Sequence, residues 1–323
     1  MAMPDRVAGE KHPQSASMPD EAKHAWIARV RRGRHIARTA LPAFAAHIES
    51  ADPDDPRASL LVAPREGAHA ALITFGGNAG YLMLHQSMRD LPDMHLIAIR
   101  DPRRCFSMCG VDGLGDTYEA CLDSLRKLLR ALGVTSVYCA GVSAGGYPAL
   151  RYGLSLKAQG VLAMSAPTTL DLKSDPGTTL ADYPFLTALY RTRREMGQDL
   201  VPLYQTTLPR PRALLLYAPS NSRDAWLSRR MGGIPGVELE ELDEKAGHRV
   251  VQWLDSTGGL ATYVNRLRAL THMRPAISPN ERRRPPIAAT ARPIAAGWAS
   301  RADAMPRDRG APIGIAPGAI GAD

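Results

Sequence analysis

The central part of the chain alternates short apolar runs with longer segments in which apolar residues recur at helical spacing. Several runs are continuously apolar, which is typical of parallel strands covered on both faces. The runs predict strands at 58–64, 70–75, 95–100, 136–141, 160–165, 213–218 and 237–242. The amphipathic segments predict helices near 79–90, 116–132, 144–155, 224–231 and 248–270.

This alternation predicts an α/β fold, with a mostly parallel, doubly wound sheet and right-handed crossovers. Residues 167–211 interrupt it, because they contain no clear strand but do include the aromatic helical stretch YPFLTALYRTRREM. An insertion here would lie over the carboxyl ends of the strands, where α/β sheets bind ligands. The segment is therefore interpreted either as a small lid-like insertion or as an ordinary peripheral helix.

Composition divides the chain into four segments. Residues 1–21 are polar and predicted to be disordered, and 22–55 form a helical extension whose arginines are interpreted as a solvated face. Residues 56–272 carry the strand–helix alternation and form the main domain. Residues 273–323 are rich in Ala, Pro, Arg and Gly, with too few large apolar side chains to offset the entropy of ordering, so they are predicted to be a disordered tail.

The strongest motif is Gly141-Val142-Ser143-Ala144-Gly145, which fits the pattern Gly-x-Ser-x-Gly. An apolar strand runs directly into it, and a helical pattern runs directly out. At such a turn the serine adopts strained backbone, the glycines let strand and helix approach, and the hydroxyl projects over the sheet. Ser143 is therefore the predicted nucleophile, and the structural alternative is a glycine-rich turn with an incidental serine.

A serine hydroxyl is a poor nucleophile at neutral pH unless a base removes its proton. Of the nine histidines, only His248 and His272 follow Ser143 in the chain. His248 stands in a short loop between the last predicted strand and the last predicted helix, so it is the predicted base. His272 lies at the end of that helix and borders the tail, which fits the role poorly.

The base in turn needs a carboxylate to orient it, and this acid is expected after the strand at 213–218. Asp224 stands there, in the loop or first helical turn, and is the predicted acid. An aspartate at this point is also suited simply to cap its helix. The other candidates for this acid are Asp171, Asp243 and Glu244.

Two backbone N–H groups are needed where negative charge develops on the substrate. Ala144, directly after the serine, is predicted to supply one. The loop FGGNAGY, residues 75–81, is predicted to supply the other through Gly77 or Asn78. A phosphate-binding turn is the alternative for this loop, although it has neither the P-loop lysine nor the spacing of a dinucleotide fingerprint.

The order of FGGNAG, CAGVSAGGYPAL, Asp224 after ALLLYA, and AGHRV resembles the α/β-hydrolase superfamily over residues 56–272. More narrowly, GVSAGGYPALRYGL, AMSAPTTLDL and YAPSNSRDAWLSRRM are similar to bacterial hydrolase-like proteins linked to polysaccharide or secretion functions. The resemblance implies the residue roles given above, no cofactor or metal, and a small-molecule acyl substrate. The HGGG loop of typical esterases is absent, so the substrate class stays open.

The implied reaction is hydrolysis of a carboxylic ester or thioester through an acyl-serine. The alternatives are an acyltransferase that uses the same three residues with an alcohol or sugar hydroxyl as acceptor, and a hydrolase-like protein that only binds. Both keep the predicted fold, and the binding protein would not need Ser143.

Charge and apolar content argue against several other classes of protein. The net charge of +8 is spread along the chain and aromatic residues make up only 6%, which argues against a nucleic-acid-binding protein. The polar N-terminus and the absence of an apolar run long enough to cross a membrane predict a cytoplasmic protein without a membrane span. Cys105 and Cys109 have no second pair or nearby histidine, so they are interpreted as thiols rather than zinc ligands.

Overall fold

The computed structural model describes residues 20–45, 59–76, 93–170 and 199–257, together with 259, 262–263, 265–266 and 269. Its centre is a seven-stranded sheet in the order β1-β3-β2-β4-β5-β6-β7. All seven predicted strands are present, with bounds that differ from the predicted ones by at most two residues. They are β1 Leu60–Ala63, β2 Ala70–Phe75, β3 Met94–Ile99, β4 Ser136–Val142, β5 Gly160–Met164, β6 Arg212–Tyr217 and β7 Val237–Glu241.

Six strands run parallel to one another, and only β1 is antiparallel to its neighbour β3. From β2 the chain moves to β3 on one side, and the later strands β4 to β7 follow in order on the other side. The strand order therefore reverses between β2 and β4. In open α/β sheets, ligands bind at the carboxyl ends of the strands at such a reversal.

The sheet is accompanied by six α-helices among the described residues. The predicted helices at 116–132, 144–155 and 224–231 are present, and the one at 248–270 begins as α9 with further helical residues beyond it. The predicted helix at 79–90 and the stretch YPFLTALYRTRREM lie outside the described residues. The helices are α1 Asp20–Ala40, α4 Tyr118–Ala131, α5 Gly146–Ser155, α7 Leu200–Thr206, α8 Ser222–Arg229 and α9 Val250–Ser256.

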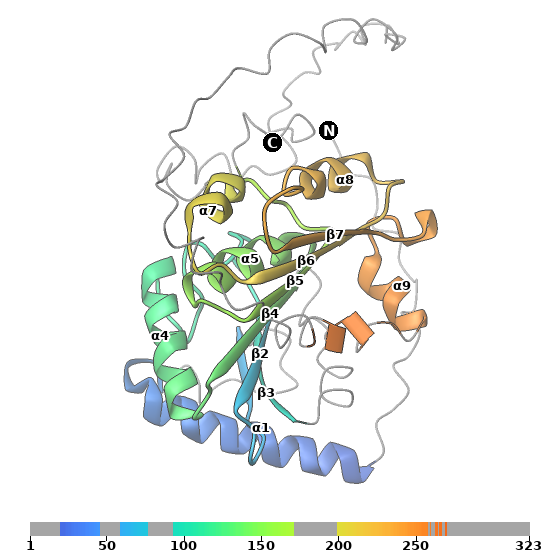
Figure 1. Ribbon diagram of the computed structural model, residues 1–323. Helices are drawn as coiled ribbons and strands as arrows, with labels where there is room; N and C mark the ends of the chain where they lie inside the picture. Colours follow the sequence, from blue (N-terminus) through green and yellow to red (C-terminus); the bar gives the residue numbers. More distant parts are fainter. Residues whose placement is uncertain are drawn as a thin grey trace, which may run out of the picture. The chain divides into compact units, whose positions relative to one another are not determined.

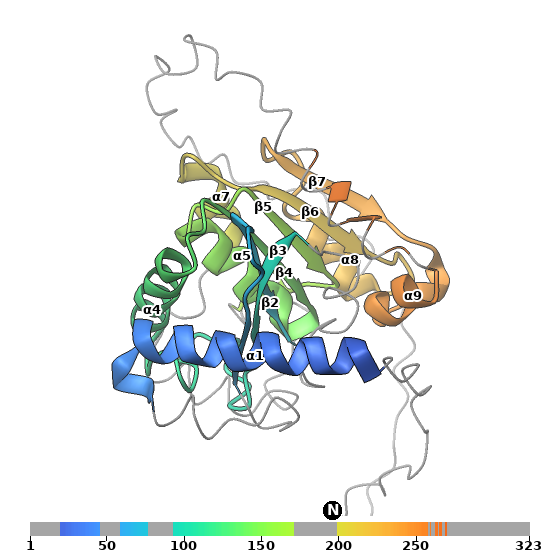
Figure 2. The same cartoon turned by 90° about the horizontal axis from the view of Figure 1, so that it is seen from below.

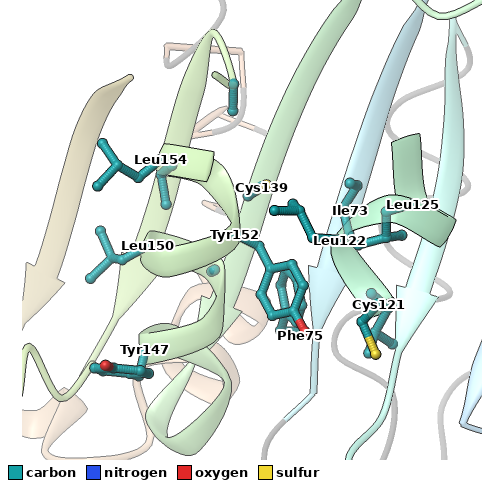
Figure 3. Close-up of a cluster of buried hydrophobic side chains, with 14 of the residues drawn as sticks. Ile73, Phe75, Cys121, Leu122, Leu125, Cys139, Tyr147, Leu150, Tyr152 and Leu154 are labelled. Carbon is teal, nitrogen blue, oxygen red and sulfur yellow. The ribbon is translucent and has the colours of Figure 1, made fainter. Parts of the chain in front are cut away.

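Alternate strand residues enter two separate cores, one on each face of the sheet. Ile73 belongs to the core under α4, α5 and α7, whereas its neighbour Leu72 belongs to the core that includes residues of α9. Figure 1 shows α4, α5 and α7 on one side of the strands and α9 on the other. In the first core the rings of Phe75 and Tyr152 lie 5.2 Å apart between β2 and α5 (Figure 3). Burial on both faces is the physical reason for the continuous apolar runs.

Helix α1 packs against the terminal strand β1 (Figure 2). Its buried face includes Trp26, Val30 and Gly33. A Cβ at Gly33 would lie 1.9 Å from the carbonyl oxygen of Val62, so only glycine allows this approach. The Arg29 guanidinium donates to two backbone carbonyls at the end of β1, at 3.1 and 3.3 Å. The helix thus covers strand backbone that would otherwise be open to pairing with another chain.

Contacts between Cα atoms divide the chain into Met1–Arg274 and Pro275–Asp323. The second unit lies outside the described residues, as do residues 1–19, so the disorder predicted at both ends stays a prediction. The insertion near 167–211 is described only at its ends, one of which contains α7. None of the helices described is long and apolar enough to cross a membrane.

Candidate active site

Ser143 lies at a sharp turn between β4 and α5. Its φ of 49° is in the left-handed region, which costs a residue with a side chain about 1–3 kcal/mol. Ser143 is the first residue of a single 3-10 turn, Ser143–Gly145, and α5 begins directly after it at Gly146. The surrounding packing must therefore hold the serine in a conformation that it would not adopt by itself.

Three glycines make this turn possible. A Cβ at Gly141 would lie 2.1 Å from the carbonyl oxygen of Gly145, so the strand and the turn could not fold back on each other. A Cβ at Gly145 would lie 2.2 Å from the carbonyl oxygen of Phe75, at the end of β2. A Cβ at Gly146 would lie 2.3 Å from the Cβ of Ala166, which follows β5. The start of α5 is thus packed between the ends of β2 and β5, the strands on either side of β4.

Asp224 lies in the first turn of α8, after β6. Its own N–H donates to the side chain of Asn221 at 3.0 Å, so Asn221 is the residue that caps this helix. The carboxylate of Asp224 is not used for capping. Its Oδ2 lies 2.7 Å from Nδ1 of His248, and the side chain is only 6% exposed.

His248 lies in the loop between β7 and α9, directly after Gly247, whose φ of 49° suits a glycine. Its Nε2 lies 2.8 Å from Oγ of Ser143. With the Asp224 carboxylate accepting from Nδ1–H, Nε2 is left to accept from the serine hydroxyl. These two hydrogen bonds form one continuous chain, here called the Ser143–His248–Asp224 chain.

The loops that carry the acid and the imidazole are tied together. The Ser220 hydroxyl, just before α8, donates to the carbonyl of Glu244 at 2.6 Å, just before His248. Asp243 accepts from the N–H of Lys245 and so caps a short 3-10 turn. Asp171 and His272 lie outside the described residues. Among the candidate acids that the structure describes, Asp224 is the one that is hydrogen-bonded to the imidazole of His248.

The hydrogen bond that His248 donates to the Asp224 carboxylate raises the pKa of His248 above its ordinary value of 6.5. Partial burial and the nearby charge of Arg223 act in the opposite direction but are smaller effects. An imidazole placed in this way accepts a proton from the serine more readily than a free imidazole. The resulting imidazolium is stabilised by the buried carboxylate beside it.

Ala144 lines a small pocket beside the serine turn. In the sheet order, the strands that lead into this pocket lie on one side of β4, and the strand that leads to His248 lies on the other. The other lining residues follow β2 and β3 or belong to α5: Gly76, Asp101, Arg104, Phe106, Ser107 and Pro148. The N–H of Gly76 donates to the carbonyl of Ile99 at 2.8 Å and is used within the sheet. The predicted donors Gly77 and Asn78 come directly afterwards and lie outside the described residues.

Sequence reasoning assigned no role to the loop after β3. Asp101 organises this loop, because its carboxylate accepts the N–H of Ser107 at 2.7 Å and its backbone carbonyl accepts the N–H of Arg104 at 3.1 Å. The Tyr152 hydroxyl of α5 donates to the carbonyl of Ser107 at 2.9 Å, which fixes the loop beside the serine turn. Nothing in the local sequence marks these contacts, because they depend on which strands are neighbours.

The strand order, the serine turn after β4, the acid after β6 and the imidazole after β7 together define the α/β-hydrolase fold. The fold predicted from the sequence is confirmed. The chain order serine, aspartate, histidine is also the order of that fold. The narrower likeness to proteins linked to polysaccharide or secretion functions stays a prediction.

Solved structures similar to this chain include MenH from S. aureus, at 12% identity, covering 66% of this chain and 99% of that one, with a TM-score of 0.45. A capsule O-acetyltransferase of Neisseria meningitidis serogroup A matches at 12% identity, covering 66% and 91%, with a TM-score of 0.47. An esterase from Pyrococcus furiosus matches at 14%, covering 64% and 85%, with a TM-score of 0.42. No family model and no curated protein matches the chain. At these identities and TM-scores the structural matches say nothing about the reaction.

Proposed function

We propose that the protein is a serine hydrolase that cleaves a carboxylic ester or thioester through an acyl-serine intermediate. The observation that carries the proposal is the continuous hydrogen-bonded Ser143–His248–Asp224 chain, with bonds of 2.8 and 2.7 Å. Its three members come from distant parts of the sequence. A hydroxyl, an imidazole and a buried carboxylate in this order are the groups that nucleophilic acyl transfer needs.

In the first half of the reaction, Oγ of Ser143 attacks the carbonyl carbon while Nε2 of His248 takes the hydroxyl proton. The negative charge on the carbonyl oxygen is held by the N–H of Ala144 and by a second N–H from Gly77 or Asn78. The bond between the carbonyl carbon and the leaving oxygen or sulfur then breaks. His248 gives its proton to that leaving atom, and an acyl-serine remains.

In the second half, water enters beside His248 and attacks the acyl carbon. The imidazole takes a proton from this water, the bond to Oγ breaks, and the proton passes to Ser143. One ester and one water thus become one acid and one alcohol. An alcohol or sugar hydroxyl in place of water would make the same acyl-serine the donor for acyl transfer, which analysis of the products distinguishes.

The test is the turnover of neutral p-nitrophenyl esters of increasing chain length by the wild type and by Ser143→Ala. The variant is expected to lose about 10⁴-fold to 10⁶-fold in kcat, because the loss of the nucleophile removes the covalent route. Ser136→Ala is the matched control, since Ser136 begins the same strand at its opposite end. A Ser143→Ala variant that is folded and turns over these esters at the wild-type rate would contradict the proposal.

A further inference from the structure

Among the described residues that line the pocket beside Ala144, Arg104 is the one with a cationic side chain. Arg104 has a φ of 53°, and Phe106 and Ser107 in the same loop have φ values of 55° and 53°. Such a cluster of left-handed residues costs free energy, so the loop is held in place by its contacts. The side chain of Arg104 is exposed. The folded loop therefore places Arg104 at the pocket.

Arg104 differs from its neighbour Arg103 in its partners. Arg103 is hydrogen-bonded to Asp112 and lies 3.9 Å from Asp116. Within the described part of the chain, no carboxylate forms an ion pair with Arg104. The guanidinium of Arg104 thus keeps its donors for a ligand.

One carboxylate, that of Asp101, belongs to a residue that also lines the pocket. Its Oδ2 accepts the N–H of Ser107 at 2.7 Å, and the backbone carbonyl of Asp101 accepts the N–H of Arg104 at 3.1 Å. Asp101 therefore shapes the loop, and within the described residues it forms no ion pair with the guanidinium of Arg104.

The sheet order indicates which part of a substrate enters this pocket. His248 and Asp224 follow β7 and β6, on one side of β4, whereas the pocket residues follow β2 and β3, on the other side. The leaving group must lie on the His248 side, because it receives its proton from the imidazole. The carbonyl oxygen faces Ala144 on the other side, and an acyl group that continues past this oxygen reaches the pocket that Arg104 lines.

We propose that Arg104 is a specificity-determining residue that binds a carboxylate at the far end of the acyl group. The preferred substrates are then half esters or half thioesters of dicarboxylic acids. This inference rests on the proposed function of Ser143. A guanidinium binds a carboxylate through two parallel N–H···O bonds, which gives direction as well as attraction. Each turnover consumes one half ester or half thioester and one water, and releases one dicarboxylic acid and one alcohol or thiol.

The experiment compares two series of p-nitrophenyl esters in the full chain. One series carries succinyl, glutaryl and adipoyl groups with a free terminal carboxylate, and the other carries neutral acyl groups with the same number of carbons. The measured quantity is the ratio of kcat/KM for each anionic ester to that for its neutral partner, after subtraction of the uncatalysed rate. The wild type is expected to prefer the anionic ester at one or more chain lengths.

Arg104→Gly removes the charge while keeping a residue for which a φ of 53° is unstrained. It is expected to lower the anionic-to-neutral ratio of kcat/KM about tenfold, because the charge-assisted contact to the terminal carboxylate is lost. Arg104→Lys should keep part of the preference, since it keeps the charge but loses the two-point geometry. Arg130→Ala is the control, because it removes an equal charge at the exposed end of α4 and should leave the ratio unchanged.

Two kinds of result would overturn the proposal, and each points to a different error. If the wild type hydrolyses neutral esters through Ser143 but shows no anionic preference, or if Arg104→Gly keeps that preference, the role of Arg104 is wrong and the proposed function stands. If neither series is turned over, or if turnover persists in Ser143→Ala, the proposed function fails and the role of Arg104 fails with it.

Discussion

At the site, the backbone of Ser143 and the pKa of His248 differ from those of the same residues in a free chain. Ser143 has left-handed backbone, and Asp224 is buried against an imidazole whose side chain is half exposed. The pKa of His248 is raised chiefly by the hydrogen bond that it donates to the Asp224 carboxylate. Both features bear on how the serine would be activated.

The pH dependence follows from this shift in the pKa of His248. The imidazole must be neutral to accept the serine proton, and a raised pKa means that more of it is protonated at any given pH. The acid limb of kcat/KM for neutral esters is therefore expected to have its midpoint above pH 6.5, the ordinary value for histidine. Rate measurements between about pH 5 and 9 would locate this midpoint.

Asp224→Asn removes the carboxylate that raises the pKa of His248. The midpoint of the acid limb should move to lower pH, and kcat should fall about 10³-fold to 10⁴-fold because the imidazole is no longer held in the productive tautomer. Asp243→Asn is the matched control, since Asp243 caps a turn in the histidine loop and an amide oxygen keeps that cap. An unchanged midpoint in Asp224→Asn, or an equal effect of Asp243→Asn, would rule out the assigned role of Asp224.

At the scale of elements, local pattern was enough to predict the strands and the serine turn. Strands β2 to β6 are continuous apolar runs because both faces of the sheet are covered, and this signal needs no knowledge of the neighbours. The elbow was also predictable, because its glycines and its flanking strand and helix are contiguous in sequence. The structure shows why glycine is needed at these positions: the start of α5 closely approaches the ends of β2 and β5.

Contacts between elements could not be predicted in the same way. Helix α8 begins two residues before the predicted start, because Asn221 rather than Asp224 caps it. The bond between Ser220 and Glu244 and the placement of Arg104 beside Ala144 depend on the order of strands in the sheet. The donors expected at Gly77 and Asn78 stay predictions.

Gly145→Ala tests whether the elbow depends on this close packing of elements. The new Cβ would lie 2.2 Å from a backbone oxygen of β2, so the turn must shift and carry Ser143 away from His248. We expect at least a tenfold loss of kcat and a loss of about 1–3 kcal/mol of stability, measured by ester turnover and urea unfolding.

Gly133→Ala is the control for that variant. Gly133 follows α4 with a φ of 68°, so alanine strains the backbone there, but its Cβ would meet nothing within 4 Å. It should lose about 1 kcal/mol of stability and keep its activity. Equal activity of the two variants would show that the elbow tolerates a side chain at position 145.

At the scale of the whole molecule, the sheet is what joins three distant segments into one site. Strands β4, β6 and β7 are parallel and close in the sheet order, so the loops after them meet at the same edge. Helix α1 covers the opposite end of that order, at β1. The proposed chemistry thus depends on the assembled sheet rather than on any short segment.

The most direct measurement is labelling of the full chain by a fluorophosphonate, which reacts with serines activated for nucleophilic attack, followed by mass spectrometry of the labelled peptide. We predict one phosphonyl group per chain, attached to Ser143, absent in Ser143→Ala and retained in Ser136→Ala. A label on a different residue, or undiminished labelling of a folded Ser143→Ala variant, would contradict the claim that the Ser143–His248–Asp224 chain activates this serine.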